Sequence, residues 1–154
     1  MKFKIFISYS TKDLALATRA QKMLQQMGYV AYVAEYNAAV GAVLTESIKQ
    51  NIANSDLFLL LWSRAEKESE WVSQETGIAT AQKKTIIPFI LEEGLHPPGF
   101  IHDLKYIPAY KGMEVALDHL HSAVLKNASQ KEKERGVLLI GLAALFLLAV
   151  GSKG

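Results

Sequence analysis

Short apolar runs alternate along most of the chain with stretches whose apolar residues recur at helical spacing. The runs have strand length and occupy residues 4–8, 29–33, 57–62, 85–91 and 104–107. Between them, Leu44, Ile48 and Ile52 recur every fourth position, which is typical of an amphipathic helix. Similar apolar faces are formed by Leu14, Ala17, Ala20, Leu24 and Met27, and by Met113, Ala116, Leu117, Leu120 and Val124. Together with a helix over 70–82, this alternation predicts an α/β domain of flavodoxin-like, three-layer type. Its central five-stranded parallel sheet has the order 2-1-3-4-5.

Turn and cap residues sharpen the expected boundaries. Ser10 to Asp13 matches the capping-box pattern, a hydroxyl at the helix cap with an acid three residues later. Gly28 ends the helix that follows. Pro88 lies inside an apolar run, and because proline removes a ladder donor, that strand is expected near an edge or bulged there.

The predicted strand order places a binding crevice. Ligands of open parallel sheets bind beyond the carboxyl ends of the strands, where the strand order reverses. Here that point lies between the first and third strands. The loop over 8–11 and the segment leading to Trp71 and Glu75 are therefore expected to converge, joined by the loop over 34–43.

Trp71 and Glu75 are four residues apart, so a helix places them on one face, one turn from each other. A carboxylate beside an aromatic ring near the end of a central strand is a candidate reaction centre. The alternative is an exposed first-turn glutamate that favours the helix dipole, with Trp71 as a packing residue.

The C-terminal segment has a different composition. Residues 130–135 carry mixed charges, whereas 136–152 carry none and show no polar stripe. At about 1.5 Å per residue, a helix over 136–152 spans roughly 25 Å, at the short end for crossing a bilayer. We therefore expect a folded domain over 1–127, a charged linker over 128–135 and a single-pass C-terminal membrane anchor over 136–152. The alternative is a buried helix or an oligomer contact.

Charges around this segment predict its orientation. Lys131, Lys133 and Arg135 precede it and only Lys153 follows, which places the folded domain in the cytoplasm. The N-terminal region shows no signal peptide, because no long apolar stretch follows its short leader.

Composition excludes several classes of site. The 154 residues suit one ordinary domain, and a formal charge of +2 gives no electrostatic reason to expect nucleic-acid binding. The absence of cysteine excludes disulfides and thiolate metal sites. The four histidines show no metal-ligand spacing, so no metal is expected.

Taken together, these motifs resemble the Toll/interleukin-receptor (TIR) domain family in its bacterial and archaeal form, over roughly residues 4–127. The residues that carry the resemblance are Phe6-Ile7-Ser8-Tyr9-Ser10 with Asp13, Gly41, Ser55-Asp56, the run from Trp71 to Ala79, Ile86-Ile87-Pro88, Gly99-Phe100 and Tyr106-Ile107-Pro108. Their order and spacing are more specific than any one of them. The C-terminal apolar segment is not part of the family pattern.

The resemblance implies an activity. Catalytic members of the family cleave NAD between nicotinamide and ribose, with NAD as substrate and no further cofactor. Glu75 after Trp71 matches their catalytic glutamate. The positions of Tyr9, Ser10, Thr11, Ala39 and Trp71 are those expected to bind NAD. In bacterial antiviral systems the product, ADP-ribose or a related molecule, activates a separate effector protein. Members generally self-associate through their TIR domains.

Two other functions are open to this fold class. One is a non-catalytic adaptor that recruits other TIR domains at a membrane; the Trp71–Glu75 pair favours the enzyme over it. The other is a phosphate-receiving regulator. It is disfavoured because the first strand ends in Ser8-Tyr9-Ser10 and the third in Trp62-Ser63, which offer no acidic pocket.

Overall fold

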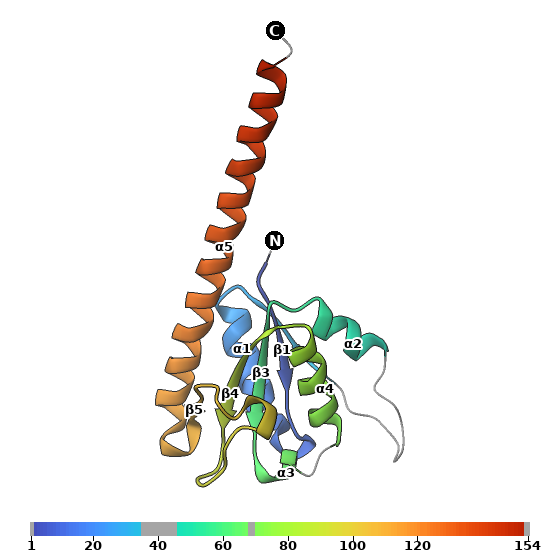
Figure 1. The fold of residues 1–154 in the computed structure, drawn as a ribbon. Coiled ribbons are helices and arrows are strands. Elements are labelled where there is room, and N and C mark those ends of the chain that lie inside the picture. Colours follow the sequence, from blue (N-terminus) through green and yellow to red (C-terminus); the bar gives the residue numbers. More distant parts are fainter. Residues whose placement is uncertain (1, 35–45, 68–69, 153–154) are drawn as a thin grey trace. The chain divides into compact units, whose positions relative to one another are not determined.

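The computed structural model describes residues 2–34, 46–67 and 70–152 (Figure 1). The chain divides into two units, Met1–His119 and Leu120–Gly154. The strands are β1 (Lys4–Ser8), β2 (Val30–Val33), β3 (Leu57–Trp62), β4 (Thr85–Ile90) and β5 (Ile107–Pro108). The helices are α1 (Leu14–Gln26), α2 (Glu46–Ala53), α3 (Arg64–Lys67), α4 (Glu70–Ala81) and α5 (Met113–Gly151). Three short 3-10 turns are η1 (Thr11–Asp13), η2 (Gly99–Ile101) and η3 (Ala109–Lys111).

The five strands form one parallel sheet in the order β2-β1-β3-β4-β5, which confirms the predicted topology. β3 lies at its centre, and all six of its residues are buried. A strand buried on both faces reads as a continuous apolar run, which is why 57–62 carries no alternation. β1 pairs with β2 on one side and with β3 on the other, so its position is fixed from both sides.

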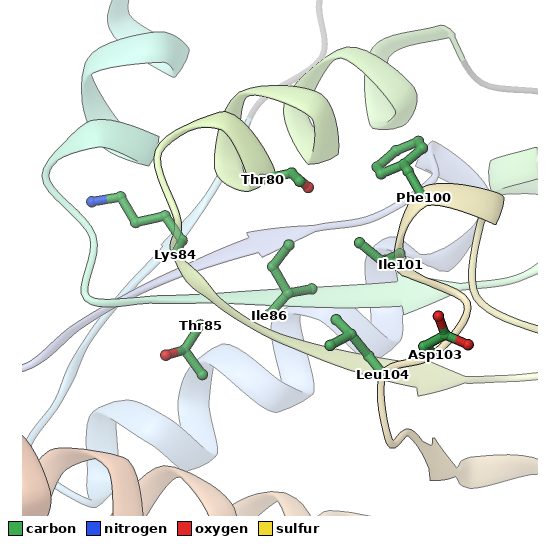
Figure 2. Close-up of a pocket in the computed structure, with 8 residues that line it drawn as sticks. All are labelled: Thr80, Lys84, Thr85, Ile86, Phe100, Ile101, Asp103 and Leu104. Atoms are coloured by element: carbon green, nitrogen blue, oxygen red, sulfur yellow. The ribbon is translucent and has the colours of Figure 1, made fainter.

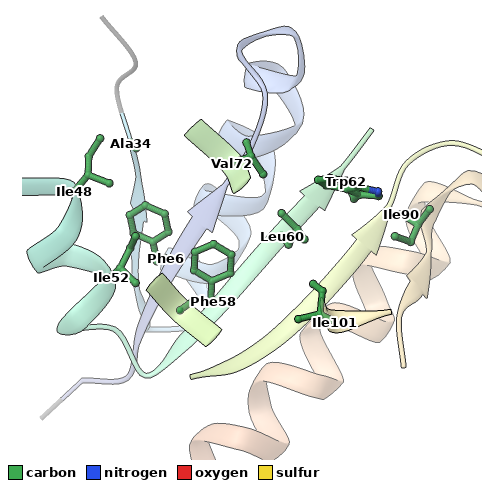
Figure 3. Close-up of a cluster of buried hydrophobic side chains, with 11 residues drawn as sticks. Phe6, Ala34, Ile48, Ile52, Phe58, Leu60, Trp62, Val72, Ile90 and Ile101 are labelled. Carbon is green, nitrogen blue, oxygen red and sulfur yellow. The ribbon is translucent and has the colours of Figure 1, made fainter. Parts of the chain in front are cut away.

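Alternate residues of the strands face opposite layers. Helices α2 and α4 lie over one face of the sheet and α1 lies over the other (Figures 1 and 2). On the α2–α4 face, a buried cluster joins strand residues to helix residues (Figure 3). Its members are Phe6, Ala34, Ile48, Ile52, Phe58, Leu60, Trp62, Val72, Ala79, Ile90 and Ile101. Because side chains along a strand alternate, Phe6 assigns Ser8 to this same face.

The structure tests the cap and end residues that the sequence predicts for the first helix. Ser10 caps η1 by accepting a hydrogen bond from the Lys12 backbone N–H at 3.3 Å. The acid of the predicted capping box acts elsewhere, because the Asp13 carboxylate accepts from Ser63. Gly28 follows α1 with a φ of 90°, the left-handed conformation that favours glycine. Leu14, predicted on the buried face, is half exposed, while Ala17, Ala20 and Leu24 are buried.

In the second half of the domain, one prediction is wrong and one short helix is not predicted by the sequence. The last strand was expected over 104–107, but the chain is still in turns at Leu104, whose N–H donates to the Ile101 carbonyl at 3.0 Å. β5 starts only at Ile107 and has two residues. The one-turn helix α3 was not predicted, because four residues are too few to show a period.

Pro88 lies inside β4 although proline has no backbone N–H to donate. β4 pairs with β3 along its length, with Leu60 opposite Pro88. Its pairing with β5 begins only at Phe89. Pro88 therefore lies just before the short β4–β5 ladder, where a missing donor costs little.

α5 continues as one helix through the residues expected to form a linker. Ala116, Leu117, Leu120 and Val124 are buried, in agreement with the predicted amphipathic face. Large apolar side chains between 137 and 150 are instead strongly exposed, from 55% to 72% of their surface. By length and composition, α5 is a helix that is able to cross a membrane.

Candidate functional site

The centre of the candidate site is a hydrogen bond between the first strand and the fourth helix. The Ser8 hydroxyl donates to Oε2 of Glu75 over 2.6 Å. Both side chains are fully buried. Ser8 ends β1 on the face that α4 covers, and Glu75 lies in the second turn of α4. The predicted convergence of the first-strand loop with the Trp71–Glu75 segment is therefore confirmed by a direct contact.

Burial excludes one interpretation of Glu75. An exposed first-turn glutamate would show a solvated side chain, whereas Glu75 exposes 0% of its surface. A carboxylate withdrawn from water is costly unless hydrogen bonds compensate it. The Ser8 hydroxyl supplies one such bond.

A second polar contact ties the same edge of the sheet together. The hydroxyl of Ser63, which follows β3, donates to Oδ2 of Asp13 over 2.7 Å. This bond fixes η1, the turn that follows β1, to the end of β3. The carboxyl ends of the two central strands thus each carry a serine bonded to a carboxylate from another element.

Beside it, Tyr9 and Ser10 are held within the protein. The Tyr9 hydroxyl donates to the Ala34 carbonyl over 2.5 Å, which links the end of β1 to the end of β2. Tyr9 and Ser10 expose 4% and 6% of their surfaces, so both lie beneath the loop surface. Thr11 is exposed.

Trp71 is half buried and packs against the cluster on the α2–α4 face. Its ring therefore contributes to the core, and only part of it faces solvent. Ala39 and Gly41, in the loop expected over 34–43, lie outside the described residues.

Charged and phenolic groups follow the neighbouring strands. Arg64 pairs with Glu92 across the ends of β3 and β4, with Nε 3.2 Å from Oε2. Burial raises the pKa of the Tyr110 hydroxyl above its ordinary value, and the neighbouring Tyr106 and Glu93 raise it further.

A cavity of about 370 Å³ lies at a different place, along α4, the start of β4 and the η2 turn (Figure 2). Ile86, Ile101 and Leu104 form much of its wall, and Phe100 stands at its side, 58% exposed. Glu75 is not among its lining residues. Lys84 points away from it, with Nζ bonded to the Ala53 and Ser55 carbonyls.

Within the described ranges, no group of three or more histidine, aspartate or glutamate residues could hold a metal ion.

Comparison with known proteins identifies the family. The model of the TIR domain family matches residues 5–121. The chain belongs to the TIR domain family. No curated protein sequence matches it.

Solved structures agree with this TIR fold. The TIR domain of the Toll-related receptor TRR-2 from Hydra magnipapillata aligns with a TM-score of 0.63 at 18% identity, covering 80% of this chain and 96% of that one. The Clostridium botulinum CMP N-glycosidase BcmB aligns with a TM-score of 0.55 at 17% identity, covering 78% and 98%. The TIR domains of the activated Roq1 resistosome align with a TM-score of 0.50 at 15% identity, covering 58% and 57%. At these identities the likeness is one of fold.

One residue of this TIR site was not singled out from the sequence. The sequence places Ser8 at the end of a strand and predicts no partner for it. Its signal is a polar residue in a strand whose other inward positions are apolar, two residues after buried Phe6. Because residues two apart on a strand lie on the same face, Ser8 faces the helix that carries Glu75.

Proposed function

We propose that this TIR protein cleaves NAD at the bond between nicotinamide and ribose, with Glu75 as the catalytic residue. The observation that carries the proposal is the Ser8–Glu75 contact. This contact holds the Glu75 carboxylate, which is buried away from water, at the carboxyl end of a central strand. In open parallel sheets this is the edge at which ligands bind.

The chemistry explains why one carboxylate suffices. Glycoside hydrolysis usually uses one carboxyl group to protonate the leaving oxygen and a second on the opposite face. In NAD the nicotinamide leaves a cationic ring as a neutral molecule, so no acid is needed. The remaining task is to stabilise positive charge on the ribose as the C1′–N bond breaks, which a negative group in a water-poor site does well. The oxygen of water, or of a hydroxyl of the same molecule, then bonds to C1′ and releases its proton to solvent, giving ADP-ribose or a cyclic product.

An enzyme of similar fold supports this proposal. The CMP N-glycosidase is named for breaking an N-glycosidic bond of a nucleotide, the class of bond that is cleaved in NAD. Trp71, half buried, would offer the exposed part of its ring to the nicotinamide or adenine. Ser10 and Thr11 would contribute at the edge of the same site.

For Glu75 to act on NAD, the dinucleotide must be able to reach its carboxylate. In the described conformation Glu75 exposes none of its surface, so a dinucleotide does not reach the carboxylate. The active state must therefore open the site while keeping the carboxylate in place. We propose that self-association of TIR domains produces that state.

The test uses the full chain in detergent micelles, incubated with NAD at increasing protein concentration. Wild-type protein should release nicotinamide, identified by mass, and its specific activity should rise with concentration. Glu75→Gln, which keeps the shape and an acceptor for Ser8, should lose about 10³-fold in kcat. Glu92→Gln, a change in a partly exposed carboxylate that pairs with Arg64 at the same edge of the sheet, is the matched control and should keep most of the activity.

The burial of Glu75 also favours a second candidate function. A non-catalytic adaptor would use Glu75 and Ser8 to hold α4 on β1 and would act by TIR–TIR assembly. Intact NAD in samples that are assembled by light scattering would exclude the enzyme and support the adaptor. Nicotinamide release that Glu75→Gln abolishes would exclude the adaptor as the sole function.

We also propose that the C-terminal part of α5 anchors the protein in a membrane, with the TIR domain in the cytoplasm. The support is the apolar, uncharged stretch over 136–152, whose large side chains are exposed. Lys131, Lys133 and Arg135 before it favour a cytoplasmic domain. A product that activates a separate effector in antiviral defence would complete this function.

A further inference from the structure

We infer that Ser8 is a positioning residue that orients the Glu75 carboxylate for the reaction. This inference rests on the proposed function. Its geometric basis is a hydroxyl donor 2.6 Å from Oε2, with both side chains fully buried. Such a short contact to an oxygen acceptor is typical of a hydrogen bond to a charged group.

Ser8 is a rigid donor because the sheet fixes its backbone. In the parallel register Ser8 is opposite Leu60 of β3, and the preceding residue, Ile7, is opposite Val33 of β2 and Leu59 of β3. A glutamate side chain has three rotatable bonds, and burial alone does not set the plane of its carboxylate. A bond from a fixed strand to one of the two oxygens restricts that plane and thereby the direction of the other oxygen.

The same bond favours the charged form of the carboxylate. Burial by itself disfavours ionisation, whereas a donor to the carboxylate favours it. Stabilising a positively charged ribose requires the negative form. Ser8 thus serves the two conditions that the proposed chemistry sets for Glu75: a defined orientation and a negative charge.

Thr76 offers a matched control. It is fully buried, it follows Glu75 in α4, and its hydroxyl donates to the Val72 carbonyl over 2.7 Å. Thr76→Val therefore removes a buried hydroxyl from the same helix without removing the bond to Oε2. A general cost of losing a buried hydroxyl should appear in both variants, and a positioning effect only at Ser8.

The experiment compares wild type, Ser8→Ala, Ser8→Thr and Thr76→Val as full chains in micelles. Ser8→Ala should lower kcat for NAD cleavage by about 10- to 100-fold, the range typical of losing a hydrogen bond that orients a metal-binding side chain. Its KM should stay within about twofold, because buried Ser8 does not reach the substrate. Ser8→Thr keeps the hydroxyl and should recover most of kcat, and Thr76→Val should stay near wild type.

A spectroscopic measurement reports on the contact without activity. The carboxyl carbon of Glu75, labelled with ¹³C and assigned by its loss in Glu75→Gln, should shift in Ser8→Ala and stay in place in Thr76→Val. An unchanged resonance in Ser8→Ala would overturn the inference. So would a kcat in Ser8→Ala equal to that of Thr76→Val, or a loss that Ser8→Thr does not recover.

These results separate the inference from the proposed function. If wild type cleaves NAD and Ser8→Ala cleaves it equally well, the positioning role fails and the activity stands. If assembled wild type leaves NAD intact, the proposed function fails and the positioning role fails with it. The carboxyl resonance then shows whether Ser8 holds Glu75 for structural reasons alone.

Discussion

Two regions of the molecule break the usual division between buried apolar and exposed polar groups, in opposite directions. At the carboxyl ends of β1 and β3, Ser8, Ser63 and Glu75 are buried polar residues. Along residues 137–150 of α5, leucine, isoleucine, valine and phenylalanine side chains are exposed. In the first region polar groups are removed from water, which is unfavourable. In the second region apolar side chains are exposed to water, which is also unfavourable.

The difference lies in how each cost is met. In the first region hydrogen bonds inside the protein replace water, as in the Ser8–Glu75 and Ser63–Asp13 pairs. In the second, no intramolecular interaction substitutes for water, because apolar groups are satisfied only by contact with other apolar matter. The buried polar region therefore supports the proposed site, and the exposed apolar region supports the proposed membrane anchor.

The largest expected effect concerns the apolar region. Removing residues 136–154 should turn a membrane-bound protein into a soluble one, a change of more than tenfold in the membrane-bound fraction after a carbonate wash. Arginine at both Leu142 and Leu145 should act similarly, because each arginine costs about 3 kcal/mol near the centre of a bilayer.

Alanine at both of these positions is the matched control, since it shortens the side chains and adds no charge. This double variant should remain in the membrane fraction. A full chain that stays in solution as a larger assembly would contradict the anchor and support an oligomer contact through this helix.

The next largest effect concerns the stability of the buried polar region. Glu75→Ala leaves the Ser8 hydroxyl buried without this acceptor and opens a cavity, so the free energy of unfolding should fall by about 3 kcal/mol. Glu75→Gln keeps the volume and an acceptor and should lose about 1 kcal/mol. Denaturant unfolding of the full chain in micelles measures both values.

A double variant sharpens this measurement. Replacing both partners, as in Ser8→Ala with Glu75→Met, removes the bond and the buried charge together. Its free energy of unfolding should lie above that of Glu75→Ala and near wild type, because an apolar pair needs no hydrogen bond. If it does, the polar pair is kept for function; a double variant less stable than either single one would indicate a structural role.

The smallest effect is expected at Ser63. Ser63→Ala removes the donor to Asp13, whose carboxylate lies nearer to water than that of Glu75. We expect a loss of about 1 kcal/mol in the free energy of unfolding, measured in the same way. A loss as large as that of Glu75→Ala would show that the two serine–carboxylate pairs are equivalent, and the contrast with Glu75 would disappear.

The sequence by itself determined the order of elements, since apolar periodicity depends only on which residues repeat. The run over 57–62 predicted a strand buried on both faces, and β3 has those bounds. Gly28 predicted the end of α1, because the left-handed conformation there suits glycine. The positions of Ser8 and Glu75 near one edge followed from the strand order.

Only the tertiary structure decided which polar groups meet. A capping box predicted that Asp13 would bond within its own turn, but the end of β3 brings Ser63 to it instead. Spacing alone left Glu75 either exposed on a first turn or facing a crevice, and packing of α4 on β1 buried it against Ser8. The reason is physical: repeats along a chain are local, whereas a hydrogen bond between residues 67 positions apart exists only once both elements have packed.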